Sequence, residues 1–183
     1  MIKRVRRKHL ERQALRHLDS LYFAALKLTG HREDAEDLVQ ETYRKAFNYI
    51  NQLRDLEKCK QWLYRIMSNT WKNWAIKRSR EVFPENQENR ADSTAQHADS
   101  NPQTHQINPE QNLMIKELWE DVDAALTRLS PNYRWAVILS DIEGFSYKEI
   151  SKIMKLPMGT VMSTLSRARR QLGGLLIKYK EKT

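Results

Sequence analysis

The stretch EGFSYKEISKIMKLPMGTVMSTLSRARRQL, Glu143 to Leu172, decides the fold class of this chain. Ser146 and Glu149 have the spacing of a capping box, in which each side chain satisfies a free backbone donor of the other residue, so a helix is expected to begin there. Pro157 has no backbone N–H and cannot continue that helix. The chain is therefore expected to turn over residues 156–159 and to start a second helix.

Both expected helices have an apolar face, and the second has cations on its free face. The first apolar face consists of Tyr147, Ile150, Ile153 and Met154, and the second of Val161, Leu165, Ala168 and Leu172. The free sides of the second helix carry Met162, Ser163, Ser166, Arg167, Arg169 and Arg170. This is the layout of a helix-turn-helix, whose second helix enters the major groove of DNA.

The same spacing is also typical of an ordinary helical pair with a solvated charged face, so spacing alone leaves both interpretations open. The local charge favours DNA. Residues 144–183 carry nine Lys and Arg against two acids, Glu149 and Glu181. Such an excess attracts phosphate groups.

The composition favours a soluble, cytoplasmic, all-helical chain. Its 183 residues carry a net charge of +9, which favours a polyanionic partner or an anionic membrane surface. No apolar run approaches the roughly 20 residues that span a bilayer, and no hydrophobic signal segment follows the basic N-terminus. Cys59 is the only cysteine, so no internal disulfide and no thiolate metal site are expected. Glycine and proline are few, and no period-two alternation suggests a sheet.

The N-terminal part is expected to form helices that carry contrasting charges. Residues 1–17 hold seven Lys and Arg against one acid. This basic stretch is expected to be either a phosphate-binding arm or a solvated, frayed terminus. One helix is expected from about Leu10 to Thr29, with Gly30 as its cap, and another from about Arg32 to Asn51. The second begins with five acids: Glu33, Asp34, Glu36, Asp37 and Glu41. Acids near a helix start favour the helix dipole, but five in nine residues exceed that need and suggest a positively charged protein partner.

An aromatic and basic segment follows, KQWLYRIMSNTWKNWAIKRSR, residues 60–80. Its first apolar residues can pack inward, whereas Trp71 and Trp74 lie with Lys72 or Lys77 toward a second surface. Aromatic and cationic side chains together can hold unstacked bases. Tryptophans at helical spacing are more often core residues, and composition alone does not decide between the two.

Residues 81–112 are rich in Asn, Gln, Ser and Asp and are nearly devoid of large apolar groups, so a flexible acidic linker is expected. His97 and His105 lie in it without neighbouring ligands, so no metal site is expected. The linker divides the chain into two small helical domains, residues 1–80 and 113–183. In the second, a helix is expected up to about Leu129, and Pro131 starts another.

Four motifs, in this order and spacing, resemble the extracytoplasmic-function (ECF) sigma factors of bacterial RNA polymerase. They are DAEDLVQETYRKAF (34–47), WLYRIMSNTWKNW (62–74), NPEQNLMIKELWEDVDAALTRLSP (108–131) and the helix-turn-helix stretch quoted above. The resemblance covers nearly the whole chain apart from the first residues and the linker. It implies sigma-2 and sigma-4 domains that bind core polymerase and recognise the minus-10 and minus-35 promoter elements. It also implies a non-enzymatic protein without a cofactor, and an anti-sigma factor as a further partner.

The resemblance assigns three groups of residues. The residues assigned to polymerase binding are Asp34, Asp37, Gln40 and Glu41. The residues assigned to minus-10 recognition and melting are Ser68, Asn69, Thr70, Trp71 and Lys72. The residues assigned to minus-35 recognition are Thr160, Met162, Ser163, Ser166, Arg167, Arg169 and Arg170. Asn69 matches a base-contacting loop position of the family. Met162 and Thr164 stand where relatives often carry Lys or Arg, and Lys155 where a turn glycine is common. The alternative is a helix-turn-helix repressor or activator that does not join polymerase, which would leave the acidic helix and the aromatic segment without a role.

Overall fold

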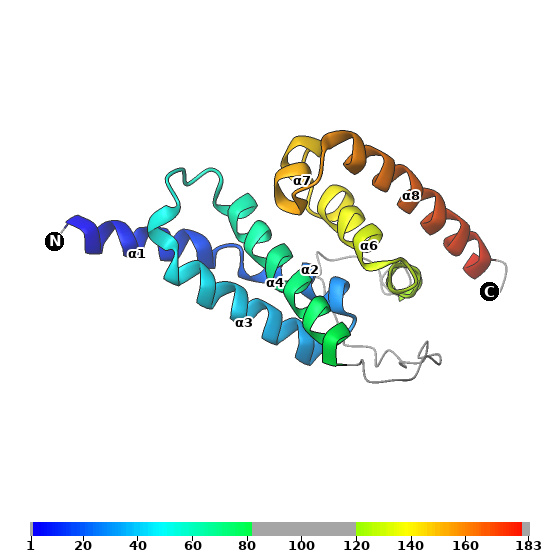
Figure 1. Ribbon diagram of the computed structural model, residues 1–183, viewed down its shortest axis with the longest axis horizontal. Helices are drawn as coiled ribbons and strands as arrows, with labels where there is room; N and C mark the ends of the chain where they lie inside the picture. Colours follow the sequence, from blue (N-terminus) through cyan, green and yellow to red (C-terminus); the bar gives the residue numbers. More distant parts are fainter. Residues whose placement is uncertain (1, 82–119, 181–183) are drawn as a thin grey trace, which may run out of the picture.

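The computed structural model describes residues 2–81 and 120–180, hereafter the N-terminal and C-terminal units, and both consist of helices (Figure 1). The N-terminal unit contains α1 (Ile2–Leu15), α2 (Leu18–Thr29), α3 (Arg32–Asn48), the 3-10 helix η1 (Ile50–Gln52) and α4 (Cys59–Glu81). In the C-terminal unit, residues 120–127 are helical and are followed by α6 (Pro131–Val137), the π-helical turn η2 (Ile138–Ile142), α7 (Tyr147–Met154) and α8 (Met158–Lys180). The all-α prediction is confirmed. Beyond Glu81, the predicted linker lies outside the described residues.

The first predicted helix is wrong in its extent, because the chain breaks between α1 and α2 instead of running as one helix. The Ala14 carbonyl accepts hydrogen bonds from the His17 N–H at 3.1 Å and from the Tyr43 hydroxyl at 2.8 Å, so the regular i to i+4 pattern stops there. The predicted end of α2 is confirmed. Gly30 adopts a left-handed φ of 77° and its N–H bonds to the Leu26 carbonyl.

The helix-turn-helix forms as predicted, with two differences. The Ser146–Glu149 capping box is present at the start of α7, and Lys155 ends α7 with a left-handed φ of 56°. Tyr147 was expected in the core but is 37% exposed, because its hydroxyl lies toward Arg169 on α8. The second helix is also longer than expected, since α8 runs without interruption to Lys180.

The two units pack against each other through α4, which lies between α3 and the helices α6 and α7 (Figure 1). Tyr64 of α4 stacks on Trp135 of α6 at 6.1 Å between ring centroids, and it meets the edge of Phe145 at 5.0 Å. One continuous cluster of buried side chains therefore runs from α1 to α8. Within the described ranges, no helix has the length and apolar character needed to cross a membrane.

Candidate functional site

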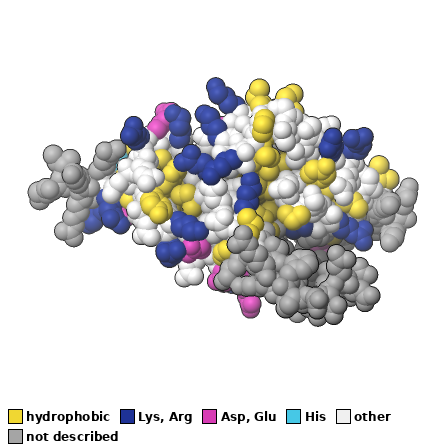
Figure 2. All heavy atoms as spheres, in the orientation of Figure 1, with side chains coloured by type: hydrophobic (Ala, Val, Ile, Leu, Met, Phe, Trp, Pro, Cys, Tyr) yellow, Lys and Arg dark blue, Asp and Glu magenta, His cyan; other side chains and the backbone are white. Residues whose placement is uncertain are grey.

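The free face of α8 is built on a buried stripe. Val161, Leu165 and Ala168 are at most 1% exposed and fix the helix against the core. The predicted minus-35 residues are all exposed: Thr160, Met162, Ser163, Ser166, Arg167, Arg169 and Arg170. Lys and Arg side chains predominate over acidic ones on the face of the molecule shown in Figure 2. The helix thus presents hydroxyl, guanidinium and thioether groups to the outside.

Arg167 and Arg169 lie in different environments. Arg169 donates from Nε to Asp141 Oδ2 at 3.0 Å, from Nη2 to Asp141 Oδ1 at 2.5 Å, and to the Ser140 hydroxyl at 2.9 Å. These hydrogen bonds raise the pKa of Arg169. Burial opposes ionisation of Asp141, but the bonds from Arg169 and Ser140 prevail and lower the pKa of Asp141. Arg167 has no hydrogen-bond or ion-pair partner among the described residues.

The ion pair of Arg169 therefore joins α8 to η2. A guanidinium engaged by a carboxylate is also less available to a phosphate group. The resemblance places Arg167 among the minus-35 contacts and Arg169 in a better position for phosphate than for bases. The ion pair of Arg169 could not be predicted from the sequence, because Asp141 lies 28 residues away in the chain.

On α3, the predicted polymerase-binding residues also differ in their partners. Glu41 accepts bonds from Arg44 at 2.6 and 2.7 Å and forms an ion pair with Lys45 at 3.3 Å. The hydrogen bonds from Arg44 lower the pKa of Glu41 to about 2. Asp37 and Gln40 are exposed, and Asp37 has no ion-pair partner among the described residues. Most of the free negative charge near the middle of α3 thus comes from Asp37.

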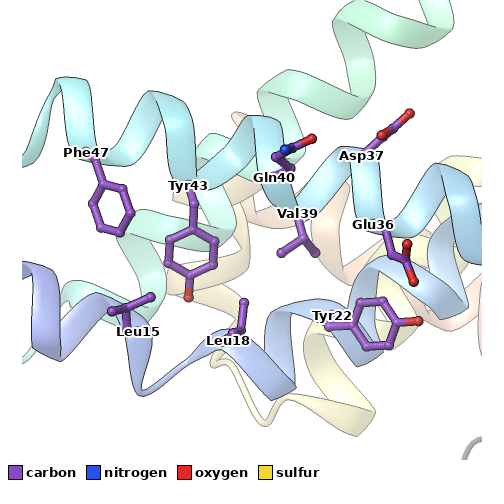
Figure 3. A pocket seen from close by; sticks show the side chains of 9 residues that line it. All are labelled: Leu15, Leu18, Tyr22, Glu36, Asp37, Val39, Gln40, Tyr43 and Phe47. Carbon is purple, nitrogen blue, oxygen red and sulfur yellow. The ribbon is translucent and has the colours of Figure 1, made fainter.

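A groove of about 480 Å³ lies beside this surface, between α3 and the junction of α1 and α2 (Figure 3). Leu15 and Leu18 are 49% and 40% exposed along it. Its other lining residues are Tyr22, Glu36, Asp37, Val39, Gln40, Tyr43 and Phe47. Asp37 and Gln40 lie at its outer edge in Figure 3. The sequence predicted the acids here but not the apolar groove, because the groove depends on the break between α1 and α2.

The predicted minus-10 residues are only partly accessible. Ser68 is 1% exposed and accepts a bond from the Trp135 indole N–H at 3.1 Å. Thr70 is fully buried and accepts a bond from Lys45 at 3.1 Å. Lys72 donates to the Met154 carbonyl at 2.7 Å, while Asn69 and Trp71 are partly exposed.

The expectation of a loop at Asn69 is wrong, because α4 is helical from Cys59 to Glu81 and Asn69 lies within it. A loop instead precedes α4, at residues 53–58, where Arg54, Leu56 and Lys58 are exposed and Leu53 is buried. The sequence signal for this loop is weak: the segment contains neither glycine nor proline, and only its run of charged residues interrupts the helical pattern.

Comparisons with known proteins agree with this geometry. Residues 14–81 match the family described as Sigma-70 region 2, and residues 119–172 match Sigma-70, region 4. The ECF RNA polymerase sigma factor SigE of Mycolicibacterium smegmatis is 36% identical over 170 residues, which cover 91% of this chain and 61% of that protein. The ECF RNA polymerase sigma-E factor of Haemophilus influenzae is 34% identical over 142 residues, covering 77% of this chain and 74% of that protein.

Two solved structures share the arrangement of helices. The sigma factor RpoE, in complex with the anti-sigma factor NepR from Bartonella quintana, superposes with a TM-score of 0.71 at 31% identity, covering 92% of this chain and 97% of that one. CnrH, in complex with the cytosolic domain of CnrY, has a TM-score of 0.60 at 20% identity and covers 93% and 89%. The second likeness supports the fold alone.

Proposed function

Because the chain belongs to the ECF sigma factors of RNA polymerase, we propose that it joins core polymerase, directs it to specific promoters and assists promoter opening. In this role it is a regulatory subunit without catalytic residues of its own, and it works in the cytoplasm. The alternative, a repressor or activator that never joins polymerase, is disfavoured by the match to Sigma-70 region 2, which accounts for the N-terminal unit.

The observation that carries the proposal is the free face of α8. Ser163, Ser166 and Arg167 project from a helix that a buried stripe fixes in place, and a capping box and a tight turn precede that helix. Hydroxyl and guanidinium groups on such a helix can bond base edges in the major groove, and the neighbouring cations can bind phosphates. This face is proposed to bind the minus-35 element.

Polymerase docking is proposed for the surface of α3. Asp37 supplies an unpaired carboxylate and Gln40 an exposed amide beside an apolar groove. A basic helix of core polymerase with a protruding apolar side chain would fit both features. Glu41 contributes less, because Arg44 and Lys45 already neutralise it.

The minus-10 element is proposed to contact α4 and the loop that precedes it. Asn69 and Trp71 are partly exposed on α4, and the loop of residues 53–58 offers an exposed cation, Arg54, and an exposed apolar side chain, Leu56. An unstacked base can be held by stacking and hydrogen bonding, and that binding energy offsets the few kcal/mol of unpairing.

An anti-sigma factor is proposed as a further partner. The structure of RpoE with NepR is the support, since that sigma factor is 31% identical to this chain along almost its entire length. A co-purification with the tagged chain from its native host should recover such a protein. Recovery of core polymerase without it would contradict this part of the proposal.

Reconstituted transcription tests the main proposal. Core polymerase mixed with the full chain should initiate at a defined set of sites on genomic DNA, and sequencing of the transcript ends would give both promoter elements. The repressor alternative predicts that core polymerase stays inactive although the chain binds duplex DNA.

A further inference from the structure

Two methionines are exposed at the start of α8. Met158 and Met162 keep 53% and 51% of their surface exposed, whereas Val161 and Leu165 beside them are buried. They lie one helical turn apart, and Ser166 continues the same row one turn later. Neither methionine belongs to a core cluster of the described residues. Folding therefore does not account for two large apolar side chains at this place.

The row lies at the edge of the face proposed to bind DNA. In the major groove, thymine is the base that presents a methyl group, and apolar side chains recognise it by contact. Methionine suits such a contact because its unbranched, polarisable side chain adapts to an irregular surface. A cation at position 162 would instead favour the O6 and N7 acceptors of guanine.

Resting on the proposed function of α8, we propose that Met158 and Met162 recognise thymine methyl groups in the minus-35 element. A methionine at position 162 thus gives a preference for thymine, on one strand or the other. Ser163, Ser166 and Arg167 supply the hydrogen bonds, and the methionine row supplies the apolar contact.

Deoxyuridine tests this inference, because it pairs like thymidine but lacks the 5-methyl group. The full chain, assembled with core polymerase, is titrated with a mapped promoter fragment in which each thymine of the minus-35 element is replaced singly by uracil. One or two replacements should weaken binding roughly three- to fivefold, the effect of losing one buried methyl group. Replacements elsewhere in the element should have little effect.

Variants assign the effect to the side chain. In Met162→Ala or Met158→Ala, at least one of these uracil penalties should disappear, whereas Met162→Leu should keep it. Ile177→Ala is the matched control, since Ile177 is 60% exposed near the other end of α8. That variant should keep every penalty. If the holoenzyme binds the promoter and uracil is tolerated equally at every thymine position, this inference alone is overturned. If the wild-type holoenzyme shows no promoter-specific binding, the proposed function is overturned as well.

Discussion

At the scale of single residues, Arg167 and Arg169 separate base recognition from helix positioning. Arg167→Ala should cost about 1–3 kcal/mol in binding to the cognate promoter and should relax the preference at one minus-35 position, since an unpartnered guanidinium is free to bond a base. Competition binding of holoenzyme to promoters varied at each minus-35 position measures both effects. An unchanged preference would remove Arg167 from base recognition.

Arg169→Ala should act on stability instead. Its ion pair with Asp141 is partly exposed, so its contribution is about 0.2–1 kcal/mol. The pKa of Asp141 is lowered in the folded chain, so this stability is present above the ordinary value of 3.8 and is lost as the pH falls through the folded value. Urea unfolding of the wild type and of Arg169→Ala should therefore differ at neutral pH and converge in acid. A constant difference down to low pH would mean that packing, not charge, holds Arg169.

Asp37 and Glu41 form a second pair of similar residues with different expected roles. Asp37→Arg should weaken core polymerase binding at least tenfold, because it replaces an unpaired carboxylate at the edge of the groove with a positive charge that repels a basic partner. Glu41→Gln should weaken it much less, since Arg44 and Lys45 already compensate Glu41. Competition for core polymerase against a labelled wild-type chain measures both. Equal losses, or none at Asp37, would contradict the assignment of the docking surface.

At the scale of elements, the turn of the helix-turn-helix stores strain at Lys155. A left-handed φ destabilises the folded chain by about 1–2 kcal/mol when the residue has a side chain, and glycine avoids this strain. Glycine also raises the conformational entropy of the unfolded chain, which lowers the free energy of unfolding by about 0.4–1 kcal/mol. Lys155→Gly should thus stabilise the chain by about 0.5–1 kcal/mol in thermal or urea unfolding. Lys152→Gly is the control, because it lies within α7 and should destabilise by about 1 kcal/mol. Destabilisation by both changes would show that the Lys155 side chain, not its backbone, matters.

Local chemistry made the starts and ends of several elements predictable. The capping box at Ser146, the cap at Gly30 and Pro131 at the first position of α6 depend on neighbours within a few residues, and all three were predicted. The break between α1 and α2 was missed because the Tyr43 hydroxyl supports it from another helix. Tyr147 was misplaced for the same kind of reason, since its partner Arg169 lies on α8.

At the scale of the whole molecule, the sequence indicated the second surface of α4 but not what covers it. Trp71 and Lys72 were expected to face away from the core of the N-terminal unit. The sequence alone could not say what they contact, because a DNA-binding surface and a surface that packs on a second unit have the same apolar and basic pattern. Lys72 in fact reaches α7. Packing between segments separated by a long, polar stretch leaves no local signal, because its contacts join residues about 80 positions apart.

The shared core predicts that the two units unfold together. Tyr64, Trp135 and Phe145 lie in one buried cluster that includes residues of α1 and of α8, so neither unit can lose its structure without exposing apolar surface of the other. In a chain labelled with 5-fluorotryptophan, the ¹⁹F signals of Trp62 and Trp135 report the two units separately during urea unfolding. Their midpoints should coincide in the wild type and in Lys58→Glu, because the ion pair of Lys58 with Asp55 is local and exposed. They should separate in Lys60→Glu, because Lys60 of α4 forms an ion pair with the Glu143 carboxylate at 3.1 Å, and that 5% exposed side chain would lose its compensating charge. Separate midpoints in the wild type would mean that the units are independent bodies and that the contacts of α4 with α6 and α7 add little free energy.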